Sequence, residues 1–261
     1  MGTPVSSAIF STLQPRRAIV PTMQPDRGAP IIVLGHGASG SAASMAPHVA
    51  GLRARGIDAR AIDLPRGRAE RAVPLFAALL TGSLRADGPR VAGDGTRVAA
   101  DAPGLASDGP RVAGDGRQPA GEAPPVARDG PRDVAGPGLA IGGHSFGGRV
   151  ASLAAADACE AGSPPLGLVL LSYPLHPPGR PDDWDARTSH WPRLGCPVIL
   201  LSGTSDPFAQ PALLRRAVAE RLRAAELVAY PRLGHGLAAV LDDALDRVAA
   251  FVLRAVAVPG Q

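Results

Sequence analysis

Short runs of apolar residues alternate with longer segments of mixed polarity along most of the chain. Short, largely apolar segments bounded by Gly, Pro or polar residues predict strands, and the predicted strands occupy residues 30–34, 57–64, 139–142, 166–172, 197–201 and 227–230. Helical patterns fill the intervals near residues 42–55, 68–82, 148–159, 210–224 and 237–255. This alternation is typical of βαβ units. It predicts an α/β fold with a mostly parallel central sheet and helices on both faces.

The segment from residue 84 to residue 137 interrupts this pattern. The tetrapeptide Asp-Gly-Pro-Arg begins at Asp87, Asp108 and Asp129, at a constant interval of 21 residues. A repeat of this kind can indicate a solenoid. Here each unit offers only Val or Leu as a large apolar side chain, too few to offset the entropy of ordering the chain. We therefore expect residues 84–137 to be a flexible low-complexity insertion in a single domain made of residues 1–83 and 138–261.

Composition and charge exclude several classes of protein. The chain has 261 residues, of which 45% are hydrophobic, as in a soluble globular protein. It contains no lysine, so arginine carries all the basic charge, and the net charge is only +4. The arginines alternate with acids and alanines instead of forming a stripe, and no apolar run is long enough to span a membrane. We expect neither nucleic acid nor membrane as a partner.

The two cysteines, Cys159 and Cys196, do not indicate a disulfide framework or a metal site. They are too few for the first and lack the spacing of metal ligands for the second. We expect both to be buried free thiols. The default compartment is then reducing and cytoplasmic.

The clearest chemical motif is Gly-x-Ser-x-Gly, with Gly143, Ser145 and Gly147 at its fixed positions. It follows an apolar run and precedes the helical pattern that starts near residue 148. A serine at such a strand-to-helix turn is held in a strained backbone conformation that exposes its hydroxyl, and the glycines give the crowded backbone room. An ordinary glycine-rich turn would also satisfy the pentapeptide. Its placement between strand and helix favours a nucleophile elbow at Ser145.

A serine nucleophile needs a base, and the base needs an orienting acid. In the fold that carries this elbow the chain order is Ser, acid, His. Asp206 follows the predicted strand at 197–201, and His235 follows the last predicted strand. Both loops should meet Ser145 at the carboxyl ends of the strands, so we predict a Ser145-Asp206-His235 triad. Other acids follow the preceding strand and are interpreted as solvated charges in a polar loop: Asp182, Asp183 and Asp185.

The loop after the first predicted strand allows two interpretations. In a hydrolase, its backbone would complete an oxyanion hole, with Gly37 giving room and the Ala38 and Phe146 N–H groups as donors. The same loop, residues 35–40, satisfies the Gly-x-Gly-x-x-Gly dinucleotide fingerprint, and Asp63 ends the next strand, where a ribose-binding acid would stand. The dinucleotide interpretation gives no role to Ser145, Asp206 or His235. We therefore favour the oxyanion loop.

Several segments together resemble the dienelactone-hydrolase-like branch of the α/β-hydrolase superfamily, which includes bacterial predicted hydrolases, the testis-expressed protein 30 and subunit 3 of the NSL complex. The resemblance implies an α/β-hydrolase fold. It also implies that the Tyr-Pro-Leu-His-Pro-Pro-Gly segment lies beside the active site. Tyr173 and His176, together with His36, are then candidate pocket residues, although a rigid proline turn and a structural His36 are the simpler interpretations. The segments that carry the likeness are residues 36–38, 143–149, 173–179 and 203–208.

These observations predict a serine hydrolase of the carboxylesterase type that cleaves a small ester-like substrate, either a carboxylester or a thioester. We expect no metal and no organic cofactor, because the triad chemistry needs neither. A non-catalytic protein-interaction module with the same fold is the main alternative, since some members of the resembled branch are scaffold subunits. A dinucleotide-dependent oxidoreductase is the second alternative. The sequence does not identify protein partners.

Overall fold

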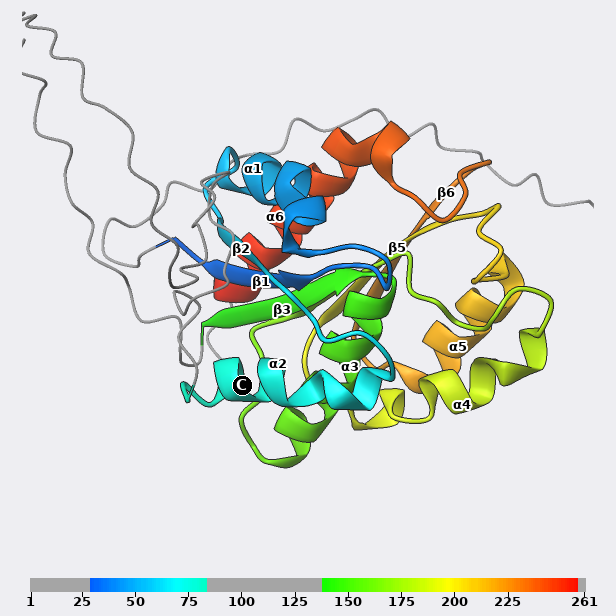
Figure 1. The fold of residues 1–261 in the computed structure, drawn as a ribbon, viewed down its shortest axis with the longest axis horizontal. Helices are drawn as coiled ribbons and strands as arrows, with labels where there is room; N and C mark the ends of the chain where they lie inside the picture. Colours follow the sequence, from blue (N-terminus) through cyan, green and yellow to red (C-terminus); the bar gives the residue numbers. More distant parts are fainter. Residues whose placement is uncertain (1–28, 84–137, 258–261) are drawn as a thin grey trace, which may run out of the picture.

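A parallel sheet forms the centre of the computed structural model, which describes residues 29–83 and 138–257 (Figure 1). Its six strands lie in the order β2-β1-β3-β4-β5-β6, and every neighbouring pair is parallel. The first described strand, β1, lies inside the sheet, the next lies at the β2 edge, and the later strands continue on the other side of β1. Open α/β sheets bind ligands beyond the carboxyl ends of the strands where the strand order reverses. The topology therefore favours a site at the loops after β1 and β3.

The strands are apolar because both faces of the sheet are covered. The inner strands β4 and β5 are buried at every position, whereas the edge strand β6 is partly exposed. The strand predictions are confirmed, with ends that differ by a few residues. The observed bounds are β1 Ile31–Gly35, β2 Asp58–Ile62, β3 Leu139–His144, β4 Leu168–Leu171, β5 Val198–Gly203 and β6 Ala225–Tyr230.

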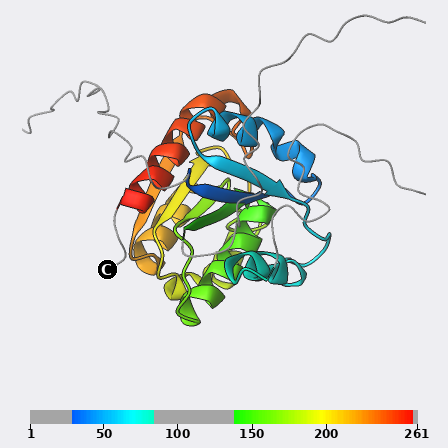
Figure 2. The same cartoon turned by 90° about the vertical axis from the view of Figure 1, so that its left-hand side faces the viewer.

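Helices cover the two faces of the sheet, with α1 and α6 on one side and α2, α3 and α5 on the other (Figures 1 and 2). The predicted helices are confirmed, and short 3-10 turns precede three of them: η1 Ala42–Met45, η2 Ala69–Arg71 and η5 Ala238–Val240. The helices are α1 Ala46–Arg53, α2 Val73–Leu80, α3 Phe146–Glu160, α5 Pro211–Arg221 and α6 Leu241–Ala257.

The hydrophobic core is divided by the sheet into two layers, and β1 shows how. Ile32 and Leu34 belong to the layer under α1 and α6, where Val248 of α6 also lies. Val33 points to the opposite layer, which contains Phe76 of α2. Successive side chains of a strand alternate between faces, so an unbroken apolar run supplies both layers. This burial fixes the strand register and thereby the positions of the loops at the carboxyl ends.

The connection between β4 and β5 contains helical turns, so the prediction of a polar loop there is wrong. Trp191 is completely buried and packs edge-on against Tyr173 at 5.1 Å between ring centroids. Arg221 of α5 lies over the ring of Trp184, 4.5 Å from its centroid. These long-range contacts order a segment whose local pattern is polar. The turns are η3 Pro181–Asp183, α4 Trp184–Thr188 and η4 Trp191–Arg193.

The predicted insertion at residues 84–137 lies outside the described residues, as do residues 1–28 and 258–261. The described chain breaks off after α2 and resumes just before β3. Within residues 29–83 and 138–257, no helix combines the length and the apolar character needed to cross a membrane.

Candidate active site

Ser145 stands at the sharp turn between β3 and α3. Its backbone has φ 51° and ψ −110°, a conformation that L-residues rarely adopt and that costs about 1–3 kcal/mol. The Ser145 N–H donates to the Leu171 carbonyl oxygen at 2.8 Å, and its own carbonyl accepts from the Arg149 N–H at 3.1 Å. The first bond continues the β3–β4 ladder and the second begins α3. Both neighbours thus hold the strained residue in place.

Two glycines, Gly143 and Gly147, allow the elbow to pack against the end of β1. A Cβ added to Gly147 would lie 2.2 Å from the Gly35 carbonyl oxygen and 2.3 Å from its carbon. A Cβ on Gly143 would lie 2.4 Å from the same oxygen. These contacts are with backbone atoms, which cannot rotate away. The motif glycines are therefore required by close packing of β1, β3 and α3 around Ser145.

Asp206 lies in the loop after β5 with its side chain fully buried. One carboxylate oxygen accepts from the Phe208 N–H at 2.8 Å, and the other faces the Nδ1 atom of His235, also at 2.8 Å. The rival acids lie elsewhere. Asp182 is exposed on the surface, Asp183 pairs with Arg180 at 2.8 Å, and Asp185 pairs with Arg221.

His235 lies between the acid and the serine. Its Nε2 atom is 2.8 Å from the Ser145 Oγ, while its Nδ1 faces Asp206. With an ionised Asp206, the Nδ1 atom carries the ring proton and Nε2 is free to accept the serine proton. The imidazole is 24% exposed, so it can be reached from solvent. The structure thus brings the three predicted residues into a continuous hydrogen-bonded chain.

The loops that carry Asp206 and His235 pack directly on each other. The Thr204 N–H donates to the Tyr230 carbonyl oxygen at 2.9 Å, and the Ser205 N–H donates to the Leu233 carbonyl oxygen at 2.8 Å. A Cβ on Gly203 would lie 2.1 Å from the Leu233 oxygen. The pairing of β5 with β6 is therefore extended past the ends of the strands, and it holds Asp206 and His235 in register.

The loop after β1 reaches the elbow, as the oxyanion interpretation requires. A Cβ on Gly37 would lie 4.0 Å from the Ser145 Cβ. A turn closed by the Gly40 N–H on the Gly37 carbonyl oxygen, at 2.9 Å, follows it and exposes Ala38. Phe146 is the first residue of α3, so its N–H has no partner within the helix. Both candidate oxyanion donors thus belong to segments in contact with Ser145.

His36 is buried and connects this loop to the segment that follows β2. It is 3% exposed, its Nε2 accepts from the Leu64 N–H at 2.9 Å, and its Nδ1 lies 2.7 Å from the Gly37 carbonyl oxygen. Asp63 accepts from the Ala42 N–H at 2.7 Å. The carboxylate that a dinucleotide fingerprint would assign to a ribose therefore binds the start of η1.

The other two candidate pocket residues are also held by contacts within the protein. The Tyr173 hydroxyl donates to the Arg187 carbonyl oxygen at 2.7 Å. The Nε2 of His176 accepts from the Gln210 N–H at 3.1 Å, and its backbone N–H donates to the Phe208 carbonyl oxygen at 3.0 Å. His176 is 1% exposed. It links the segment after β4 to the loop that carries Asp206, as a structural interpretation of this segment predicts.

His144 is a member of the site that the sequence analysis missed. Its Nε2 lies 3.2 Å from the His235 carbonyl oxygen, and the two rings are 5.3 Å apart. Burial lowers the pKa of His144, so the neutral ring donates its Nε2 proton to that carbonyl. The residue before Ser145 therefore fixes the backbone of His235. The sequence shows His144 inside the pentapeptide, but it does not show that the backbone of His235 passes beside it.

Replacing His144 by Ala should lower kcat by about 10- to 100-fold, because a base displaced by a fraction of an ångström loses alignment with Ser145. KM should change little, because His144 donates to the protein backbone. Steady-state kinetics on a chromogenic ester would measure both parameters. His144→Gln retains an amide donor and should recover part of kcat. Equal loss in both variants would mean that the hydrogen bond to His235 does not position the base.

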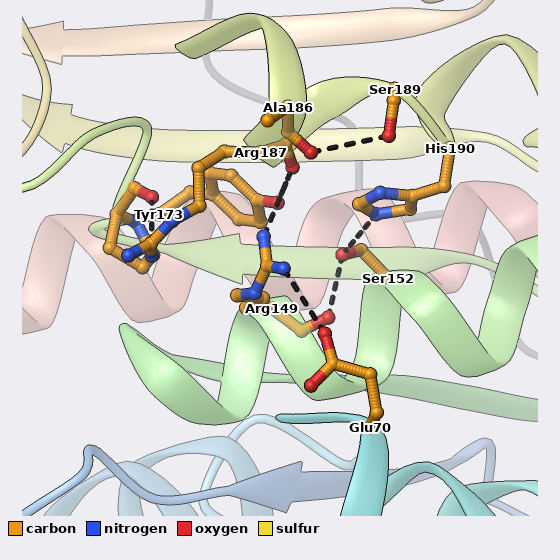
Figure 3. A network of polar contacts seen from close by, with 9 residues as sticks. Glu70, Arg149, Ser152, Tyr173, Ala186, Arg187, Ser189 and His190 are labelled. Carbon is orange, nitrogen blue, oxygen red and sulfur yellow. Dashed lines mark hydrogen bonds and ion pairs between the residues drawn. The ribbon is translucent and has the colours of Figure 1, made fainter. Parts of the chain in front are cut away.

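A second polar cluster joins α3 to the turns after β4 (Figure 3). Ser152 donates to the Arg149 carbonyl oxygen at 2.8 Å, so the Nε2–H of His190 donates to Ser152 at the same distance. Arg149 reaches the Arg187 carbonyl oxygen at 3.3 Å and Glu70 at 3.5 Å. This cluster ties the nucleophile helix to the α4 region. It also contains a histidine that must stay neutral.

Acid should destabilise the protein through its buried histidines. Burial, with Arg149 and Arg193 nearby, lowers the pKa of His190 to about 3, and burial with His144 lowers that of His48 to about 4. The unfolded chain, with ordinary pKa values near 6.5, binds protons first as the pH falls. Stability is thus complete above pH 6.5 and falls below it, by about 2 kcal/mol per histidine at pH 5.

Urea unfolding of the wild type and of His190→Gln at pH 7 and pH 5 would measure this effect. The Gln amide can still donate to Ser152 but does not titrate. Its loss of stability between the two pH values should be about 2 kcal/mol smaller than that of the wild type. An identical loss in both proteins would show that His190 does not titrate on unfolding.

Within the described ranges, no group of three or more His, Cys, Asp or Glu side chains is placed to hold a metal ion. The grouped polar side chains of the site are those of Ser145, Asp206 and His235, with His144 beside them. Their arrangement can move a proton from the serine hydroxyl to an imidazole, which produces a nucleophile.

Comparison with known proteins finds a family that matches part of the chain. Residues 126–239 match the family described as "Alpha/beta hydrolase domain". The matched range contains Ser145, Asp206 and His235. No curated protein matches the chain.

Solved structures share the fold at low sequence identity. A monoacylglycerol lipase from Paleococcus ferrophilus superposes with a TM-score of 0.56 at 13% identity, over 87% of this chain and 96% of the other. Est1E from Butyrivibrio proteoclasticus, with ferulic acid bound, gives 0.56 at 15% identity, over 88% and 90% of the two chains. A dienelactone hydrolase from Anabaena variabilis gives 0.51 at 16% identity, over 88% of each. Together with the parallel six-stranded sheet, these likenesses confirm the predicted fold, and the chain is an α/β-hydrolase-fold protein.

Proposed function

We propose that this protein is a serine hydrolase that cleaves a small ester-like substrate, a carboxylester or a thioester, through an acyl-enzyme on Ser145. The observation that carries the proposal is the pair of 2.8 Å contacts that His235 makes, one with Ser145 and one with the buried carboxylate of Asp206. A structural histidine would not require a serine held at a strained turn on one side and a buried acid on the other.

The mechanism follows from the atoms in contact. His235 Nε2 takes the hydroxyl proton while Ser145 Oγ attacks the substrate carbonyl carbon. Asp206 holds the Nδ1 proton and stabilises the imidazolium. The Phe146 and Ala38 N–H groups are the proposed donors to the tetrahedral oxyanion. His235 then protonates the leaving group. A water molecule, activated by the same imidazole, releases the acid and regenerates Ser145.

Solved structures with the same fold support the proposal that this protein acts on ester-like substrates. The similar structures include a monoacylglycerol lipase, Est1E with ferulic acid bound and a dienelactone hydrolase. The dienelactone hydrolase also supports placing the chain near that branch of the superfamily. The narrower likeness to testis-expressed protein 30 and subunit 3 of the NSL complex rests on the sequence segments at 36–38, 143–149, 173–179 and 203–208 alone.

A fluorophosphonate probe tests the proposal without knowledge of the natural substrate. The wild type should be labelled at neutral pH, with the adduct on the peptide that contains Ser145, and Ser145→Ala should show no labelling. Ser152→Ala is the matched control, because that serine is buried and should leave labelling intact. A folded wild type that stays unlabelled would refute the hydrolase and favour an interaction module. Binding of NAD to that unlabelled protein would favour the oxidoreductase.

A further inference from the structure

Both cysteines of the chain meet at the end of the fold that lies away from Ser145. Cys159 is in the last turn of α3, and Cys196 lies just before β5. The 15-residue helix α3 separates Cys159 from Ser145 by about 20 Å at 1.5 Å per residue. Neither thiol has a role in the proposed catalysis.

The two residues are in contact through the turn at Gly195. The Gly195 N–H donates to the Cys159 Sγ at 3.2 Å, and a Cβ built on Gly195 would lie 3.8 Å from both the Sγ and the Cβ of Cys159. Cys196 follows immediately, and its thiol and its N–H lie close enough to the Cys159 sulfur to act on the pKa of Cys159. The sulfur of Cys159 thus has two successive backbone N–H groups and a second thiol around it.

This surrounding distinguishes the two sulfurs. The Cys196 thiol and the N–H groups of Gly195 and Cys196 lower the pKa of Cys159, with burial acting against them. The hydrogen bond to Cys159 and burial raise the pKa of Cys196. Asp157 and Glu160 flank Cys159 in the sequence, and Arg193 contacts both, at 3.1 Å and 2.6 Å. Arg193 offsets one of these two negative charges, and the hydrogen bonds to the sulfurs decide which thiol ionises first.

The two thiols also differ in their exposure to solvent, and Cys159 is again the more reactive of the two. Cys159 is partly exposed, whereas Cys196 is 4% exposed. An oxidant from solvent therefore meets Cys159 first, and the sulfur nearest to the product of that reaction is the sheltered Cys196. A reactive, accessible thiolate beside a second thiol is the arrangement of a reversible oxidation site.

We propose that Cys159 and Cys196 form a peroxide-reactive pair that closes to an intramolecular disulfide. The Cys159 thiolate attacks one oxygen of a hydroperoxide, breaks the O–O bond and becomes a sulfenic acid, while the other oxygen leaves as hydroxide or alkoxide. The Cys196 sulfur then attacks the Cys159 sulfur, its proton goes to the departing hydroxide, and water is released. Two thiols are oxidised, and one peroxide is reduced.

The disulfide would join the end of α3 to the start of β5, two elements whose opposite ends carry Ser145 and Asp206. It would close a loop of roughly 40 residues, which restricts the unfolded chain. The thermal midpoint should therefore rise by about 5–10 °C in the oxidised protein. The catalytic residues are at the far ends of both elements, so the pair acts on stability and not on the reacting atoms.

The test uses the full-length protein and hydrogen peroxide, with readouts that do not depend on hydrolase activity. Peroxide should remove two free thiols, lower the intact mass by two hydrogens and yield one cross-linked peptide pair that contains residues 159 and 196. Dithiothreitol should reverse the rise in the thermal midpoint. Thiols that survive peroxide in the folded protein but react after denaturation would overturn the proposal, as would disulfides formed only between molecules.

Single substitutions assign the two roles. In Cys196→Ser, peroxide should leave Cys159 as a sulfenic acid that dimedone traps, whereas Cys159→Ser should give neither dimedone adduct nor disulfide. Equal trapping in both variants would contradict the order of reaction. If a variant does not fold, alkylation of the reduced wild type by iodoacetamide decides the same point, because Cys159 should be modified first. Prior modification of Cys196 would overturn the assignment.

Discussion

Replacing Asp206 by Asn is expected to lower kcat for ester hydrolysis by about 10⁴-fold while the protein stays folded. The Asn side-chain oxygen can still accept from the Phe208 N–H, which holds the group in its present orientation. Its amide nitrogen then faces the His235 Nδ1 and donates to it. The ring proton is forced onto Nε2, so the imidazole presents a donor to Ser145 where the reaction needs an acceptor.

Steady-state kinetics on a chromogenic ester, with circular dichroism to check folding, would measure this effect. Asp182→Asn is the matched control, since Asp182 is an exposed acid of the turns after β4 and should leave kcat unchanged. A folded Asp206→Asn variant with wild-type kcat would remove Asp206 from the mechanism. One of the surface acids would then have to be reconsidered as the partner of His235.

Replacing Gly147 by Ala is expected to cost at least about 4 kcal/mol of unfolding free energy, enough to prevent folding of many domains. The added methyl group would overlap the carbonyl group of Gly35 and approach its Cα within 2.9 Å. Relief requires β1 to move away from α3, and β1 is hydrogen-bonded on both sides. Relief of the clash would therefore also disturb the hydrogen bonds of β1 with β2 and β3.

Thermal and urea unfolding would show the loss, or expression would yield only insoluble protein. Gly138→Ala provides the comparison, because none of the described residues has an atom within 4 Å of a Cβ at Gly138. That variant should unfold within about 1 kcal/mol of the wild type. Wild-type stability in Gly147→Ala would show that the elbow and the oxyanion loop are not packed as tightly as the structure has them.

The sheet and the proposed triad were predictable because their signals are local. An apolar run such as residues 30–34 is unambiguous when both faces of a strand are buried. Ser145, Asp206 and His235 could be chosen because parallel strands deliver their following loops to a single edge. The order of those loops along the chain was then sufficient to predict that the three side chains lie close together.

The features that were missed depend on contacts between distant segments. The α4 region looks polar along the chain, and it is ordered by Trp191 in the core and by Arg221 on Trp184. The role of His144 depends on where the backbone of His235 passes. The meeting of Cys159 with Cys196 depends on the turn at Gly195. None of these has a period or a spacing by which a sequence pattern could reveal it.

The hydrogen bonds between the β5 and β6 loops divide the catalytic residues into two unequal parts. Asp206 and His235 are carried by one continuous piece of backbone pairing, so they move together, while Ser145 arrives from the other side on β3 and α3. The backbone pairing that holds Asp206 and His235 thus does not include Ser145, and His144 at the end of β3 is the link from the nucleophile strand to the His235 backbone. In evolutionary terms, the residue at position 145 can be exchanged for another nucleophile, such as cysteine, without rebuilding the groups that activate it.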